Sequence, residues 1–214
     1  MGKLVDSLLS GSSGTIGRLV VANVSGTEIL RARPRKRTAQ SSPNQLLVQQ
    51  RMSMTYDFLL PYKEFAKKYF GTRIGMKSPY NQAMTNLLNA FKLDFVLSKV
   101  VPTYSEIEFA RGSLLGVIPT GLSSPDPLSI RIDWFENSGA DPVRESDSLQ
   151  VLYVAEGEIR PTFIQNVAIR SKAKIDIPLP PNYQGKTLHV WLAFQSADLK
   201  LVSLSNYAGS VLVT

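Results

Sequence analysis

The chain has 214 residues, of which 43% are apolar, and its 24 Lys and Arg against 17 Asp and Glu give a formal net charge of +7. This apolar fraction is enough to build a core, which excludes a chain that is disordered throughout. With no cysteine and one histidine, the sequence excludes disulfides, cysteine nucleophiles, and metal sites built on thiolates or on several histidines.

The charge is distributed unevenly along the chain. Residues 1–100 carry 15 basic and 5 acidic side chains, whereas residues 101–214 carry 9 basic and 12 acidic ones. Such asymmetry indicates a basic N-terminal region that meets an anionic partner, either nucleic acid or an acidic protein surface.

The first residues, MGKLVDSLLSGSSG, contain only a short apolar piece, which Asp6 interrupts. A secretory signal needs a longer apolar region, and no stretch approaches the roughly 20 apolar residues that cross a bilayer. The sequence therefore predicts synthesis in the cytoplasm without a signal peptide, and no insertion into a membrane.

Residues 15–33, TIGRLVVANVSGTEILRAR, predict a β-hairpin. Two runs rich in β-branched residues flank VSGT, where Gly26 supplies the turn. Because a two-stranded ribbon is marginally stable in water, we expect it to pair with another sheet or another chain.

Two helices are predicted to follow the hairpin. Ser42, Pro43 and Gln45 have the pattern of an N-cap, a first-turn proline and the far end of a capping box. Apolar residues then recur at helical spacing as far as residue 70, and Pro61 predicts a kink or a break. The same start signal at residues 78–79 precedes a second apolar stripe, which ends near residue 91.

After about residue 95 the apolar period changes from 3.6 to 2, which is typical of strands. Alternating segments at 128–134, 149–153, 175–179 and 188–194, with further short strands to the C-terminus, are separated by loops rich in Pro, Gly and Asn. They predict an antiparallel, immunoglobulin-like β-sandwich of about seven strands. The expected fold class is α+β, with a basic β-ribbon and helical region at 1–95 and the sandwich at 96–214.

No pattern in the chain is typical of an active site. His189 lies on the face opposite Leu188 and Val190 without a nucleophile nearby, so we expect a half-exposed strand residue and not a general base. The stretch GSSGTIGR at 11–18 fails the spacing of a phosphate-binding loop, and the acidic residues of 133–147 lack the spacing of a calcium loop. We therefore predict a non-enzymatic protein without a cofactor or a metal.

The candidate interaction site is a basic segment within ILRARPRKR, residues 29–37. In an extended chain its alternate arginines share one face at a spacing of about 6.6–6.8 Å, which is close to the phosphate spacing of a DNA strand. No aromatic residue interleaves them to stack on bases, and no helix-turn-helix or RNA-recognition signature is present. The segment predicts an acidic protein partner or, alternatively, nucleic acid, and its residues are Arg31, Arg33, Arg35, Lys36 and Arg37.

The arrangement of these parts resembles an uncharacterised family of proteins of about this length from Bacteroidota, a domain of unknown function. The residues that carry the resemblance are Gly14, Gly17, Gly26, Arg31, Pro34, Lys36, Gln45, Gln49 or Gln50, Arg51, and in the closing strands Ser203, Ser205, Tyr207 and Gly209. The resemblance covers nearly the whole chain and implies no particular activity.

The N-terminal half is also similar to phage structural proteins, in which a short strand pair, an arginine segment with proline and a helix of the type T-x-x-Q…R occur together. Thr38, Gln40, Gln45 and Arg51 depart from the usual spacing of that pattern. This second similarity implies assembly, phage-derived or virion-like, and association with a virion.

Three hypotheses about function follow. The leading one is a structural or interaction protein that assembles with itself, as a homo-oligomer or larger assembly, or with a neighbouring protein. The alternative is a nucleic-acid-binding protein that uses residues 31–37. A carbohydrate-binding or adhesion module is the third, and it requires exposed aromatic side chains such as Trp134, Trp191 and Tyr207, although the alternation of its strand places Trp134 inward.

Overall fold

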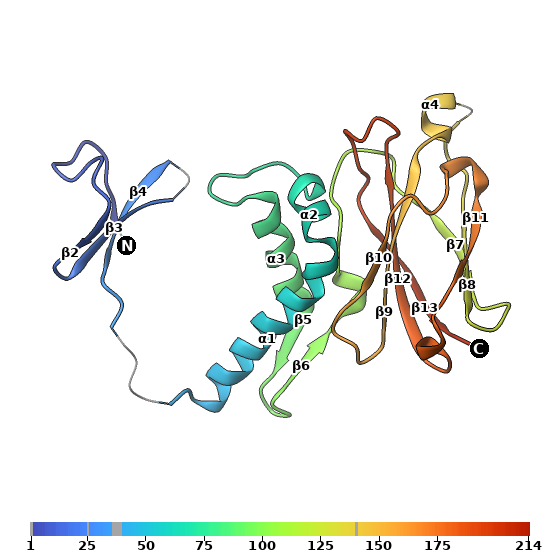
Figure 1. Ribbon diagram of the computed structural model, residues 1–214, viewed down its shortest axis with the longest axis horizontal. Helices are drawn as coiled ribbons and strands as arrows, with labels where there is room; N and C mark the ends of the chain where they lie inside the picture. Colours follow the sequence, from blue (N-terminus) through green and yellow to red (C-terminus); the bar gives the residue numbers. More distant parts are fainter. Residues whose placement is uncertain (1, 25, 36–39, 140) are drawn as a thin grey trace. The chain divides into compact units, whose positions relative to one another are not determined.

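The computed structural model describes residues 2–24, 26–35, 40–139 and 141–214. The chain divides into two compact units. The first comprises Met1–Ser41 with Ile74–Met76, and the second comprises Ser42–Arg73 with Lys77–Thr214. Each unit has sheets of its own, so the two are described in turn (Figure 1).

The first unit is an antiparallel sheet with the strand order β1-β4-β3-β2. Its strands are β1 (Gly2–Lys3), β2 (Gly14–Ile16), β3 (Leu19–Val24) and β4 (Thr27–Ala32). β3 and β4 correspond to the predicted hairpin, whose turn places Val24 opposite Thr27. Gly26 adopts a φ of 84° there, a conformation that favours glycine. The glycine-rich start of the chain adds the two outer strands, so the predicted ribbon is the centre of a larger sheet.

The second unit begins with helices at the predicted start signals. α1 (Pro43–Leu59) has a capping box, in which the Ser42 hydroxyl accepts from the Gln45 N–H and the Gln45 side chain accepts from the Ser42 N–H. At Pro61 the helix gives way to the 3-10 turn η1 (Leu60–Tyr62), because proline lacks the N–H that a regular helix needs. The elements that follow are α2 (Lys63–Tyr69), α3 (Pro79–Ala90), the hairpin β5 (Phe91–Asp94) and β6 (Lys99–Pro102), and the turn η2 (Tyr104–Glu106).

The remainder of the second unit forms two antiparallel sheets. The central sheet, in the order β10-β9-β12-β13, consists of β10 (Thr162–Ile164), β9 (Ser148–Ala155), β12 (Thr187–Gln195) and β13 (Asn206–Leu212). The outer sheet, in the order β11-β8-β7, consists of β11 (Lys174–Pro178), β8 (Ser129–Trp134) and β7 (Pro119–Ser123). Short turns lie between them at α4 (Pro142–Glu145), η3 (Arg170–Lys172) and η4 (Pro181–Tyr183).

The central sheet is covered on both faces (Figure 1). Along β12, Leu188 and Val190 pack with the outer sheet, whereas Trp191 and Ala193 pack with the helices. The ring of Phe58 in α1 meets the Trp191 ring edge-on, with the centroids 6.1 Å apart. The second unit therefore has three layers, which are the helices, the central sheet and the outer sheet.

The division of the chain differs from the predicted boundary between residues 95 and 96. Helices and central sheet share one apolar cluster, which includes Phe58, Leu87, Phe109, Leu152 and Trp191. The helical region therefore belongs to the same compact unit as the sandwich, and the division falls after Ser41. A change of apolar period marks where the secondary structure changes, and it does not mark where a core ends.

His189 is not the half-exposed residue that strand alternation predicts. Its side chain is buried, with the residue 9% exposed, its ring stacks on Tyr104 with the centroids 3.6 Å apart, and its Nδ1 lies 2.7 Å from the Tyr207 hydroxyl. The prediction was wrong because Tyr104 of the turn η2 covers the face that alternation assigns to solvent. Burial lowers the pKa of His189, and the charge of Glu156 opposes this shift.

One end of the sandwich is held by a buried ion pair between Arg170 and Asp147, which are 0% and 2% exposed. The guanidinium donates to Asp147 Oδ2 from Nη2 at 2.8 Å and from Nε at 3.2 Å. It also donates to the Asn137 side chain and to the Leu115 carbonyl, and it lies 3.9 Å from the centre of the Phe194 ring. This network compensates the charge of Asp147 inside the protein.

We predict that replacing Arg170 by Met lowers the free energy of unfolding by about 3–5 kcal/mol, because Asp147 would remain buried without its counter-charge. The matched control is Arg131→Met, which removes an exposed pair between Arg131 and Asp176 and should cost about 1 kcal/mol or less. Urea denaturation measures both values. Equal losses in the two variants would contradict the assignment of Arg170 as a buried structural ion.

We also predict that the free energy of unfolding decreases as the pH is lowered from about 7 to about 5. Because burial lowers the pKa of His189 in the folded state, the unfolded chain binds the proton more readily, and stability is lost as the pH falls through the folded pKa. His189 is the only histidine of the chain, so His189→Gln should flatten the profile over this window. Denaturant titrations at several pH values test this, and parallel profiles would refute it.

Candidate functional site

The basic segment begins in β4 and continues beyond it. Arg31 lies opposite Val20 of β3, and the N–H of Arg33 donates to the Arg18 carbonyl at 2.7 Å. Arg31, Arg33 and Arg35 are all exposed, and none of the ion pairs found between described residues involves them. The predicted site residues Lys36 and Arg37 lie outside the described residues.

The structure adds Arg18 to this segment. Arg18 precedes β3 and is exposed, and the hairpin brings its backbone into hydrogen-bonding contact with Arg33. In the sequence Arg18 is the last residue of GSSGTIGR, a stretch for which no interaction site is predicted. The predicted turn was nevertheless enough to find this neighbour. A hairpin that pairs Val24 with Thr27 also places Arg18 opposite Arg33.

The first unit buries little apolar surface. Among its described residues, the buried apolar side chains are Val21 and Ile29. Those that are exposed include Val5, Leu8, Ile16, Leu19 and Val24. Residues 1–41 also carry seven basic side chains against two acidic ones. Since units near 40 residues rarely bury enough surface to be stable through their own core, this sheet presents an apolar and basic surface suited to a partner.

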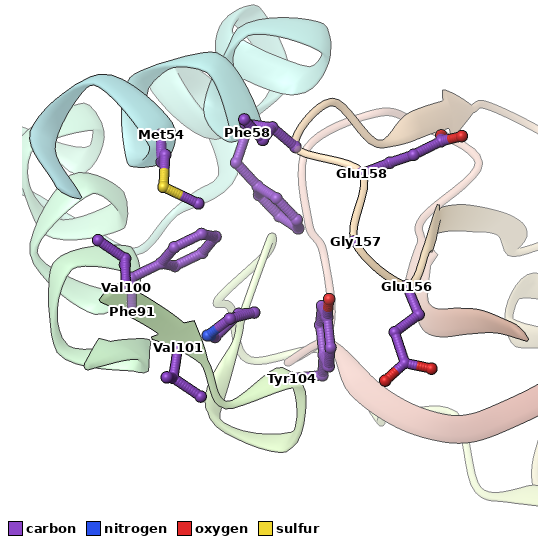
Figure 2. A pocket seen from close by; sticks show the side chains of 11 residues that line it. Met54, Phe58, Phe91, Val100, Val101, Tyr104, Glu156, Gly157 and Glu158 are labelled. Atoms are coloured by element: carbon purple, nitrogen blue, oxygen red, sulfur yellow. The ribbon is translucent and has the colours of Figure 1, made fainter. Parts of the chain in front are cut away.

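A second candidate site is a pocket of about 340 Å³ within the second unit (Figure 2). It opens between α1, the β5–β6 hairpin, η2 and the loop that follows β9. Its walls are mostly apolar, and they are formed by Met54, Phe58, Phe91, Val100, Val101, Pro102, Tyr104 and residues 156–159. Residues so far apart in the sequence carry no common motif, which is why sequence reasoning missed this pocket.

Tyr104 links the pocket to the interior. Its ring lines the pocket (Figure 2) and also stacks on His189, whose Nε2 is buried without a hydrogen-bond partner. Burial raises the pKa of Tyr104, and a hydrogen bond with the Gly157 backbone opposes this shift. Gly157 has a φ of 83°, a conformation that favours glycine, so the loop forming this wall depends on that residue.

Charged side chains flank the pocket on the loop that follows β9. Glu158 pairs with Lys186 at 2.8 Å and Arg160 pairs with Asp57 at 3.1 Å. Glu156 is exposed, and within the described part of the chain it takes part in no ion pair. Figure 2 shows its carboxylate on the side of the Tyr104 ring that faces away from the other walls. The interior of the pocket is therefore mainly apolar and aromatic.

The described residues contain no group of three or more histidine or acidic side chains placed to hold a metal ion. None of the helices in the described ranges is long and apolar enough to cross a bilayer. Trp134 and Trp191 are both buried, so neither contributes to an exposed aromatic surface of the kind that a carbohydrate-binding module needs. The arrangement is suited to binding, and the surfaces that support it are the basic sheet of the first unit and the mainly apolar pocket of the second.

No curated protein matches this sequence. Among solved structures, the chain is similar to the solution structure of the fn3 domain of human collagen alpha-1(XX) chain, with 17% identity, a TM-score of 0.36, and coverage of 48% of this chain and 90% of that chain. The model of a family of unknown function matches residues 11–209, which confirms the resemblance to such a family. The chain belongs to the family of unknown function DUF6266.

Proposed function

We propose that this protein is a non-enzymatic structural or interaction protein that assembles with copies of itself or with a neighbouring protein. The observation that carries the proposal is the sheet of the first unit, where Val21 and Ile29 are buried while several large apolar side chains of the described residues remain exposed. Covering this surface with a partner is the direct way for so small a unit to gain stability. A phage-derived or virion-like setting belongs to the same proposal, on the strength of the N-terminal similarity to phage structural proteins.

The outer side of α1 supports the same proposal. Val48, Met52 and Tyr56 follow one another at four-residue spacing and are 43%, 48% and 42% exposed. α3 differs, because its apolar side chains are buried or half-buried and polar residues such as Asn89 are exposed. Exposed apolar side chains that gather along one side of a helix are typical of a surface that meets a partner. We therefore propose the outer side of α1 as a second surface for assembly.

Nucleic-acid binding through residues 31–37 remains the second candidate function. It is favoured by the exposed cluster of Arg18, Arg31, Arg33 and Arg35, which forms no ion pair between described residues. Residues 1–41 contain no Phe, Trp or Tyr, so the unit offers no ring for bases to stack on. For this reason we favour a protein partner.

We expect replacement of Arg31, Arg33, Arg35, Lys36 and Arg37 by Gln to weaken assembly. DNA binding by the wild-type protein should be weak and should fall steeply with salt, by a slope of about 0.9 for each phosphate contact. Light scattering measures assembly, and fluorescence anisotropy with labelled DNA at several salt concentrations measures binding. A monomeric wild-type protein that binds DNA tightly at physiological salt, and loses that binding in the variant, would favour nucleic acid instead.

We expect Met52→Glu to weaken self-association by roughly tenfold or more, since an unpaired charge in an apolar interface costs more than about 1.4 kcal/mol. Asn89→Glu is the matched control, because it places the same charge on an exposed position of α3 and should leave association unchanged. Sedimentation velocity measures both variants, with thermal unfolding as the check on folding. Equal association in the two variants would remove α1 from the proposed interface.

A further inference from the structure

We infer that a further pocket of the second unit binds a small molecule that carries a phosphate group. This pocket, the basic pocket, has a volume of about 380 Å³ and lies between the end of α2, residues 111–113 and the loop that follows β12. It shares no lining residue with the pocket in Figure 2. Among the described residues that line it, none is acidic and three are basic, namely Lys68, Arg111 and Lys200.

Hydrogen bonds at Tyr69 bring the three basic residues together from distant segments. The Tyr69 hydroxyl donates to the Leu199 carbonyl at 2.7 Å, which holds the loop of Lys200 against the end of α2, next to Lys68. The backbone N–H of Arg111 donates to the Tyr69 carbonyl at 3.0 Å. The three cations therefore surround one pocket because Tyr69 contacts the segments that carry them.

The backbone at residues 111–113 lies close to the loop after β12. A Cβ on Gly112 would lie 2.2 Å from the Val202 carbonyl oxygen, so a larger residue does not fit there without a backbone shift. The same carbonyl accepts from the Leu114 N–H at 3.1 Å. Thr72 and Ser113 add hydroxyl groups to the lining, and hydroxyls can donate to phosphate oxygens.

The two lysines are available to an anion. Lys68 takes part in no ion pair between described residues, and its Nζ lies 4.8 Å from the centre of the Tyr69 ring. Lys200 pairs with Asp198 at 3.4 Å, and the two side chains are 79% and 54% exposed. Because so exposed a pair contributes little stability, an anion in the pocket can attract Lys200 at small cost.

The arginine has a donor to spare. Arg111 donates to one oxygen of Glu108, from Nε at 2.9 Å and from Nη2 at 2.6 Å, which leaves its Nη1 for another acceptor. A phosphate group presents several oxygens and carries up to two negative charges, so it can accept from Arg111 and from both lysines at once. The volume of the pocket lies near the lower end of the range for small-ligand sites, which leaves room for a small organic group beside the phosphate.

The test compares two full-length double variants. The pocket variant carries Lys68→Gln and Lys200→Gln. The control carries Lys99→Gln and Lys174→Gln, which remove the same charge from exposed lysines outside the pocket that form no ion pair between described residues. Isothermal titration calorimetry with inorganic pyrophosphate, at low and at physiological salt, measures binding. Each titration is repeated with Gln at all basic positions of residues 31–37, so that the basic segment does not contribute.

The wild-type protein should bind pyrophosphate and retain that binding at physiological salt. The pocket variant should bind about tenfold more weakly or worse, since charge-assisted hydrogen bonds are lost, and the control should bind like wild type. Thermal unfolding confirms that each protein is folded, and pyrophosphate should raise the unfolding temperature of the wild type and the control.

Three results would overturn the inference. They are the absence of pyrophosphate binding by the wild type, equal affinities in the pocket variant and the control, and tighter binding of the dicarboxylate succinate than of pyrophosphate. A single-stranded oligonucleotide that displaces pyrophosphate at a much lower concentration would assign the pocket to nucleic acid and overturn the small-molecule ligand. Assembly is measured separately, by sedimentation velocity without pyrophosphate, so a failure of the proposed function is distinguished from a failure of this one.

Discussion

The second unit depends on one constraint, which is that its central sheet has to be buried on both faces. β12 carries Leu188 and Val190 on one face and Trp191 and Ala193 on the other, and each pair packs into a different apolar cluster. A strand apolar on both faces needs a cover on each side. The outer sheet supplies one cover, and the helices from α1 to α3 supply the other.

The pocket is a consequence of this layering. It opens where the helical cover meets the loop that leaves the central sheet after β9, and Tyr104 stands between the pocket and the buried His189. The loop can form this wall because Gly157 tolerates a φ of 83°. An apolar pocket at a seam between layers is a usual place for a ligand.

The two units differ in how they use polar and apolar side chains. The second unit has an extensive core and encloses the ion pair of Arg170 and Asp147 within a hydrogen-bonded network. In the described part of the first unit, Val21 and Ile29 are buried, and arginines and large apolar residues lie on the surface. The second unit therefore has an extensive core of its own, whereas the first unit has little. This difference is the basis of the proposed assembly function.

The sequence by itself determined the features that rest on neighbouring residues. Local hydrogen bonds and backbone conformation set three such features, which are the capping box of Ser42 and Gln45, the break at Pro61 and the turn at Gly26. These features can therefore be recognised in the sequence alone. Only the tertiary structure decided which faces are covered. Alternation along β12 could not show that Tyr104 of η2 covers His189, and a change of apolar period could not show that helices and strands share one core. The pocket likewise depends on side chains brought together from distant segments, because burial is a property of packed layers and not of any single stretch of chain.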